Sequence, residues 1–301
     1  MAVYNFTHQS PGAPALTGTA GSLIPILDYC LLTAGWTKPF SGTNTAVYKQ
    51  GTGSTGHYFV FNDTGAQETL VTASKEVTGV SSITNAFVSS SIVRKSEAAS
   101  AVTRPWNIIC NEKTVFMIFY TSLDASTQNF GNLGSTVGAA TFWFGDFKTY
   151  RNGDQWNAFC HNFTTTGMAG QGAGYKLDKI KIPRPFTQIG QSITGGFLVP
   201  SNTNNNWSGY GPSFPDPIRQ QINLEKVQVY ENGSLNFRRG SLPGVWDIIH
   251  TGLTTLSGDT FSGSGNLSGK SFIIHQTSMN GGSISTYGRI AYETSNTWET
   301  Y

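Results

Sequence analysis

Hydrophobic residues follow a helical period in one stretch of this chain, shortly before residue 35. The apolar residues at helical spacing are Leu23, Ile26, Leu27, Cys30 and Leu31. Ser22 can cap the first turn, where the missing N–H of Pro25 does no harm, and Gly35 can end the helix. The pattern predicts a short helix over 22–32 that lies on a sheet.

From Trp36 onward the period changes to two, which is typical of strands with one buried face. Loops rich in glycine and asparagine separate the apolar runs, and Asn152-Gly153 is a strong hairpin-turn signal. The predicted strands are Ala46–Lys49, His57–Phe61, Glu68–Thr72, Trp106–Cys110, Val115–Tyr120, Thr141–Phe144, Trp156–Asn162, Val227–Tyr230, Ser234–Arg238, Ser271–His275 and Arg289–Glu293. The basic segment Lys176–Arg184 also alternates and is typical of a half-buried strand. The whole pattern predicts an all-β fold of β-sandwich-like, packed antiparallel sheets.

Composition divides the chain into three regions. Residues 1–21 are rich in Gly, Pro, Ala and Thr and predict an extended N-terminal arm, which is ordered only when something holds it. Residues 22–162 predict a β domain that contains the short helix. The glycine-rich segment 163–175 is the best candidate boundary. Residues 163–301 form a second β-rich region, which either stands alone or completes the same sandwich.

Charged side chains are sparse on this chain. Asp, Glu, Lys and Arg make up 12% of its 301 residues, roughly half the usual share. A surface with so few charges is poorly protected against association, so we expect contacts with copies of the chain or with other proteins. The alternative is a secreted β-protein that relies on Asn, Ser and Thr for solubility. The net charge of +2 provides no basic field for nucleic acid, and no apolar stretch approaches a transmembrane helix in length.

The cysteines and the first residues add little chemistry. Cys30, Cys110 and Cys160 stand at wide, irregular spacing, which fits neither a disulfide framework nor a zinc site. Their neighbours predict that Cys110 and Cys160 are small buried residues in strands. The N-terminus carries neither a basic n-region nor an apolar h-region, so we expect synthesis in a cytoplasm without a secretory leader.

Candidate catalytic groupings are weak. Asp146 and Asp154 can supply the two carboxylates of a glycosidase, yet Gly-Asp steps in β-proteins mostly form turns in which Asp bonds its own backbone. Cys160 and His161 are neighbours that point to opposite faces of a strand, so they do not form a nucleophilic pair. No two histidines have metal-ligand spacing, and the glycines of 51–56 precede a strand rather than a helix. The sequence therefore predicts no catalytic residue, no metal and no cofactor.

The best binding candidates are aromatic residues outside the predicted strands. They are Trp207, Tyr210 and Phe214 in the long loop 201–217, and Tyr4 and Phe6 in the N-terminal arm. Long loops of this kind are usually functional. Loop aromatics stack on sugar rings or anchor protein interfaces, and packing in the core is the alternative. In an assembly protein the interface role is favoured.

A pattern of aromatics, glycines and turns runs through much of the chain. It comprises Ala34–Tyr48, Tyr58–Asp63, Arg104-Pro105-Trp106, Thr114–Tyr120, Phe144–Phe147, Tyr150, Gly153-Asp154, Arg239–Trp246, Gly258–Gly263, Tyr292–Ser295 and Trp298. This pattern resembles virion structural proteins of tailed bacteriophages over residues 22–162 and 235–298. Residues 163–230 have no counterpart in the resemblance.

The resemblance implies a component of the tail, baseplate or collar, located in the virion and made in the host bacterial cytoplasm. Its implied partners are other virion proteins and copies of itself, with no nucleic acid and no membrane. Such a protein is not an enzyme. The alternative is a glycan-binding or receptor-binding module of the same particle, with a host surface glycan as its ligand. A hydrolase would instead need two carboxyls that face each other across a cleft.

Overall fold

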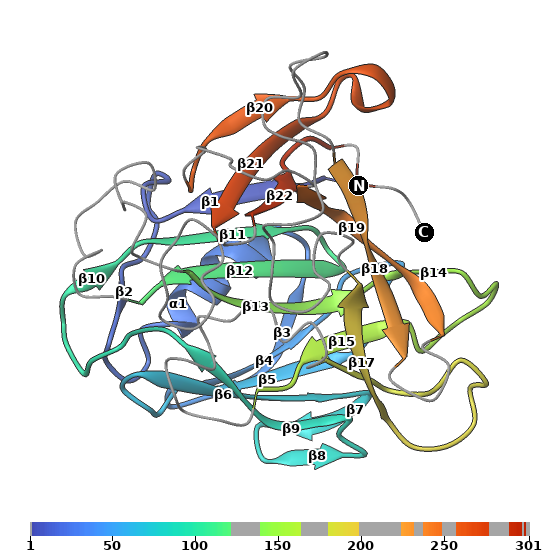
Figure 1. Cartoon of the computed structure of the whole chain (residues 1–301). Coiled ribbons are helices and arrows are strands. Elements are labelled where there is room, and N and C mark those ends of the chain that lie inside the picture. Colours follow the sequence, from blue (N-terminus) through green and yellow to red (C-terminus); the bar gives the residue numbers. More distant parts are fainter. Residues whose placement is uncertain are drawn as a thin grey trace.

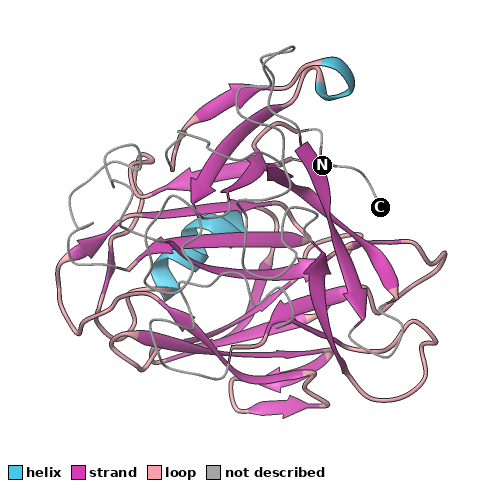
Figure 2. Ribbon diagram, in the orientation of Figure 1, coloured by secondary structure: helices cyan, strands magenta, loops and turns pink. Residues whose placement is uncertain are grey.

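Strands make up most of this protein in the computed structural model (Figures 1 and 2). The structure describes residues 2–121, 139–163, 180–198, 224–231, 237–248, 257–276, 289–296 and 298. All strand pairs among these residues are antiparallel. The predicted all-β, sandwich-like fold with one short N-terminal helix is confirmed.

The strands form one large sheet, a smaller sheet and two short pairs. The 13-stranded sheet runs in the order β1 (Tyr4–Thr7), β11 (Trp106–Cys110), β12 (Thr114–Tyr120), β13 (Ala139–Asp146), β15 (Ala158–His161), β16 (Ile180–Ile182), β17 (Ile193–Leu198), β18 (Leu224–Glu231), β19 (Arg238–Ile248), β22 (Arg289–Glu293), β21 (Ser271–Gln276) and β20 (Thr260–Ser262), with β14 (Lys148–Thr149) beside β19. The five-stranded sheet is β3 (Thr37–Gly42), β4 (Thr45–Lys49), β5 (Tyr58–Asn62), β6 (Glu68–Ser74) and β9 (Val88–Arg94). The short pairs are β2 (Leu16–Thr17) with β10 (Thr103–Arg104) and β7 (Glu76–Gly79) with β8 (Ser82–Thr84). The helical turns are α1 (Ile24–Leu27), η1 (Asp28–Leu32) and η4 (Gly265–Leu267).

Strands β11, β12 and β13 lie at the centre of the molecule, because both of their faces are covered. Every residue of β12 is buried. On one face, Met117 and Phe144 belong to a core that includes the helix and the five-stranded sheet. On the other face, Phe116 and Trp143 belong to a core that includes residues of β16 to β19, β21 and β22. A strand covered on both faces has to be apolar along its whole length, as β12 is.

The large sheet therefore supplies two of the three layers. Its far strands, β18, β19, β21 and β22, contribute Val229, Val245, Ile273 and Tyr292 to the core on the second face of β12. The Phe116 and Tyr292 rings lie 5.8 Å apart between centroids. In Figure 1 these strands lie above and to the right of β11–β13, and the five-stranded sheet lies below.

The predicted helix is present, although its predicted cap is wrong. Helix α1 continues into the wider π-helical turn η1. The N-cap is Leu23, and the Ser22 hydroxyl donates to the Thr17 carbonyl at 2.7 Å instead of capping the helix. The Asp63 carboxylate, brought in from the end of β5, accepts the Leu23 N–H at 2.8 Å. Gly35 adopts a φ of +91° just beyond the helix, as expected of the residue that ends it.

The segment expected to be an extended arm is held by the chain itself. Strand β1 pairs with β11, with Tyr4 opposite Cys110, and β2 pairs with β10. Leu16 is fully buried, and the Trp106 indole donates to the Pro14 carbonyl at 3.1 Å. Without β1, strand β11 would be an open edge of the large sheet. The segment is therefore held by its own chain, and it supplies the backbone partners of β11 and β10.

The large sheet also crosses the expected boundary at residues 163–175, of which 164–175 lie outside the described residues. Strand β15 precedes this segment and β16 follows it, and the two strands pair with Cys160 opposite Lys181. All the later strands of the chain that the structure describes extend this same sheet. The two expected regions are thus joined by continuous backbone hydrogen bonding.

Three buried histidines contribute to the interior as neutral rings. In His275, Nδ1 lies 2.9 Å from the Tyr120 hydroxyl and Nε2 lies 2.6 Å from Asn107 Oδ1. His161 Nδ1 accepts a backbone N–H of β13 at 3.0 Å. Burial lowers the pKa of His57, His161 and His275 to about 3 each. All three rings are therefore uncharged near neutral pH.

We expect the free energy of unfolding to fall as the pH drops below about 6.5, the ordinary histidine pKa. Each buried histidine takes up its proton only when the chain unfolds. This uptake lowers the free energy of unfolding by about 1.4 kcal/mol per pH unit for each ring. Burial raises the pKa of Asp146 to about 6, so this carboxyl acts in the opposite direction between pH 6 and about 4. One carboxyl offsets only one of the three histidines. Urea unfolding from pH 7 to pH 4 measures the slope, and equal stability at pH 7 and pH 5 would contradict the expectation.

Candidate functional site

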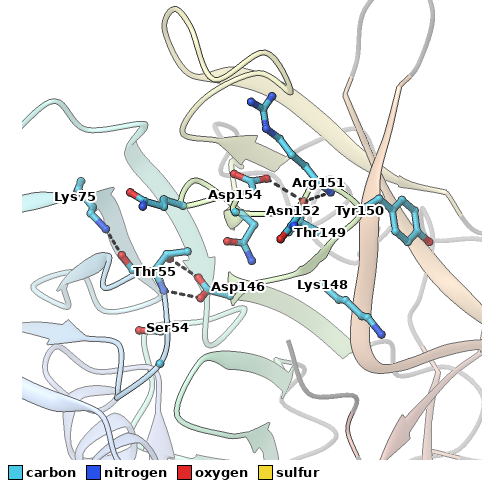
Figure 3. Close-up of a pocket in the computed structure, with 14 residues that line it drawn as sticks. Ser54, Thr55, Lys75, Asp146, Lys148, Thr149, Tyr150, Arg151, Asn152 and Asp154 are labelled. Atoms are coloured by element: carbon cyan, nitrogen blue, oxygen red, sulfur yellow. Dashed lines mark hydrogen bonds between the residues drawn. The ribbon is translucent and has the colours of Figure 1, made fainter.

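A cavity, here called the main cavity, opens between two segments far apart in sequence. It has a volume of about 700 Å³ and is lined by residues 53–55 and Lys75 on one side and by residues of the 146–157 segment on the other (Figure 3). Hydroxyl, amide and charged side chains dominate its wall, and Tyr150 is the one aromatic residue in its lining. The cavity is therefore suited to a polar ligand.

Asp146, at the end of β13, pins the facing loop to the central sheet. Its Oδ1 accepts hydrogen bonds from Gln50 Nε2 at 2.8 Å and from the Thr55 hydroxyl at 2.5 Å. Its Oδ2 accepts the Thr55 N–H at 2.8 Å. Burial raises the pKa of this carboxyl to about 6, and the bonds from Thr55 and Gln50 limit the rise. The loop that carries Thr55 is thereby fixed relative to β13.

Two glycines allow the loop and the central strands to approach each other closely. Gly145 has a φ of +125°, and a Cβ there would lie 2.3 Å from the Lys113 carbonyl oxygen. Gly51 donates its N–H to the Glu112 carbonyl at 2.8 Å, and a Cβ there would lie 2.7 Å from the Gly35 oxygen. A side chain at Gly145 would push β13 away from the start of β12, and one at Gly51 would push the loop away from the turn between β11 and β12.

A chain of hydrogen bonds continues from Asp146 through Thr55 to His57. The Thr55 hydroxyl donates its single proton to Asp146, so it accepts the Nδ1 proton of His57 at 2.8 Å. In the neutral ring Nε2 then carries no proton, and it is buried without a hydrogen-bond partner. His57 and Trp156 line a second cavity of about 250 Å³, and Lys75 lines both cavities.

Asp154 is held equally firmly on the other side of the main cavity. Its Oδ1 accepts the Trp156 N–H and the Gln188 amide, both at 2.9 Å. Its Oδ2 accepts from Arg239 at 2.8 Å and from the Thr149 hydroxyl at 3.0 Å. Burial tends to raise the pKa of Asp154, but the Trp156 amide and the Arg239 guanidinium together hold it below its ordinary value.

The structure brings the two sequence-predicted carboxylates to one cavity, but it does not make them a catalytic pair. Their pKa values shift in opposite directions, as the acid and base of a glycosidase require. A carboxylate offers about four acceptor positions, and donors from this chain fill four on Asp154. Asp154 therefore has no lone pair left for a water molecule or a substrate. Both groups are fixed parts of the cavity wall.

The other predicted site residues lie elsewhere. Tyr4 and Phe6 stack on each other with 5.6 Å between ring centroids, and Phe6 meets the edge of Tyr29 at 5.2 Å. Both are half-buried against the core, so they pack within the chain. The loop aromatics Trp207, Tyr210 and Phe214 lie outside the described residues.

The cavity residues that sequence reasoning missed are Lys75, Lys148, Tyr150 and Arg151. The only signal in the sequence near these residues is the Asn152-Gly153 turn, which lies between Arg151 and Asp154. This turn predicts a hairpin but gives no indication of a cavity. Lys75 lies at the end of β6, far from the hairpin in sequence. Its place on the wall depends on how the two sheets pack together.

The remaining candidate chemistry is structural. Cys30, Cys110 and Cys160 are free and buried, and burial raises the pKa of each thiol. Among the described residues, no group of three or more His, Cys, Asp or Glu is placed to hold a metal ion. No helix in the described part of the chain has the length and apolar character needed to cross a membrane.

No family model matches the chain, and no curated protein matches it.

We expect Asp146→Ala to destabilise the fold by about 3 kcal/mol, because it leaves a buried amide and a backbone N–H without their acceptor. Calorimetric unfolding measures the loss. Glu76→Ala is the control, since Glu76 is exposed and lies near the same loop. A change in Asp146→Ala no larger than in this control would contradict the clamping role.

Proposed function

We propose that this chain is a structural component of a tailed-phage virion that acts by protein–protein assembly in the tail, baseplate or collar. The observation that carries the assembly role is a set of four exposed apolar side chains on segments joined by one hydrogen-bond network, here called the apolar corner. Its members are Tyr150, Phe186, Ile189 and Phe237, which are 55%, 37%, 79% and 55% exposed.

Arg239 draws two members of the apolar corner together. Its carbonyl accepts the Tyr150 N–H at 2.8 Å, and its guanidinium lies 5.8 Å from the centre of the Phe186 ring. Arg151 lies over the same ring at 5.5 Å. Arg239 itself is fully buried. Its contacts hold Tyr150 and Phe186 in place while these two side chains remain exposed.

The other two members join through neighbouring contacts. The Phe237 carbonyl accepts the Glu231 N–H at 2.8 Å, which places Phe237 where β18 and β19 meet. Ile189 follows Gln188, whose amide bonds the Asp154 carboxylate at 2.9 Å. That carboxylate also binds Arg239, so all four members lie on segments tied to one buried network.

Exposed apolar side chains that gather in one place favour association. Burying apolar surface in a contact contributes about 25 cal/mol of favourable free energy for every Å² removed from water. Grouped apolar residues on a surface therefore mark protein-binding sites. The low charge of the chain acts in the same direction, since few like charges oppose contact between copies. Other virion proteins and copies of the same chain are the proposed partners.

The virion part of the proposal is supported by the resemblance to tailed-phage structural proteins over residues 22–162 and 235–298. A receptor-binding module of the same particle is the second candidate. It is favoured by the polar cavity beside the apolar corner, since such a wall suits a glycan better than an apolar ligand.

Mass spectrometry of purified particles tests the virion assignment. We expect peptides of this chain at a fixed molar ratio to the major virion proteins, because a structural component is present in every particle. A chain that is abundant in infected cells but absent from particles purified to constant composition would refute the assignment.

Ile189→Glu combined with Phe237→Ser tests the apolar corner. We expect self-association, measured by analytical ultracentrifugation, to weaken about tenfold or more because the changes place polar groups in the contact. The control is Val102→Glu, since Val102 is 44% exposed beside β10, across the molecule from β14 in Figure 1. A wild-type chain that stays monomeric at high concentration and binds no purified virion protein would contradict the assembly role.

A further inference from the structure

The main cavity has the size of a ligand site, and many of its lining residues carry hydrogen-bonding groups. Small-molecule sites have volumes of about 300–1,000 Å³ and are mostly apolar. This cavity has about 700 Å³, and residues such as Ser54, Thr55, Asn152 and Gln155 add hydroxyls and amides to its wall. Side chains of these kinds bind the hydroxyl groups of sugars, since each can donate and accept hydrogen bonds.

The walls are rigid before any ligand binds. Asp146 holds the loop of Thr55, and Asp154 is locked by four donors of the same chain. Asn157 donates to the Phe147 carbonyl at 2.6 Å, which braces the strand behind the hairpin. A preformed wall binds with less loss of conformational entropy than a mobile one.

The charges in the cavity wall favour an anion. Lys75, Lys148 and Arg151 belong to the lining, although Lys75 donates to the Thr55 carbonyl and Arg151 donates to the Phe186 carbonyl. Of the two carboxylates, Asp154 is neutralised by Arg239 and Asp146 is 2% exposed. A negative group that enters the cavity therefore meets cations at the surface and carboxylates that are already bonded.

Tyr150 gives the rim an aromatic face. It is 55% exposed, and its hydroxyl donates to the side chain of Gln228, so the ring has a fixed position (Figure 3 shows it beside Lys148). An exposed aromatic face next to hydrogen-bonding groups suits a sugar ring, whose C–H face is apolar and whose edge is polar.

We propose that this cavity binds a carboxylated saccharide, with the sugar ring on Tyr150 and its carboxylate toward Lys148. The binding belongs to the purified chain and does not depend on its place in a virion. The ligand would be an acidic unit of a cell-surface or capsular polysaccharide, recognised by its charge and its hydroxyl groups.

Titration calorimetry on the full chain tests the proposal with acidic oligosaccharides and their uncharged counterparts. The probes are oligomers of galacturonate, of guluronate and mannuronate, and of hyaluronan, together with sialyllactose, each compared with its methyl ester. At least one acidic probe is expected to bind about tenfold or more tightly than its ester, with an affinity that falls as salt is added. Equal binding of acid and ester, or binding of no acidic probe, overturns the proposal.

Two variants locate the binding in this cavity. Lys148→Met and Tyr150→Ala are each expected to weaken binding about tenfold. Lys38→Met is the matched control, because it removes the same charge from the helix side of the molecule, where Lys38 pairs with Asp28. Thermal unfolding of all three verifies that they fold. A folded Lys148→Met variant with unchanged affinity places the ligand elsewhere and refutes the site, whatever the assembly state of the chain.

Discussion

Burial of β11, β12 and β13 on both faces is the constraint on which the rest of this fold depends. Apolar side chains on two faces need cover on two sides, or the sheet would expose them to water. The helix and the five-stranded sheet cover one side. The large sheet covers the other side by folding its own far strands back over it. As a result Trp143 and Phe144, neighbours in sequence, belong to two separate cores.

Polar side chains enter this apolar arrangement mainly where the layers end, and there they are paired. Asp146 joins the end of β13 to the loop before β5, and Arg239 joins β19 to Asp154 and Glu231. Burying such groups costs desolvation energy, which is offset only when each group finds well-placed partners. The pairing leaves a rigid junction, and both the main cavity and the apolar corner lie on it. Tyr150 belongs to both, so ligand binding and assembly would meet at one side chain.

Local pattern predicted much of the fold because burial leaves a record along the chain. Strands β4, β5, β11, β12 and β22 follow the predicted ranges closely, since each presents apolar side chains to at least one core. Strands β9 and β17 were not predicted, because their sequences lack a clear alternation of apolar and polar residues. Val88–Arg94 contains three successive serines and Ile193–Leu198 contains two glycines, so their pairing depends on backbone bonds to β6 and β18.

The sequence by itself determined that this chain is all-β, with one short helix and few charges, and it identified Asp146 and Asp154 as the carboxylates to examine. Only the tertiary structure decided what those carboxylates do. Thr55, which bonds Asp146, is 91 residues away from it in sequence, and Arg239, which bonds Asp154, is 85 residues away. It also turned the expected N-terminal arm into an edge strand of its own sheet. Periodicity reports which face of a segment is buried, but hydrogen bonds between distant segments depend on how the sheets pack, and that packing has no local signature.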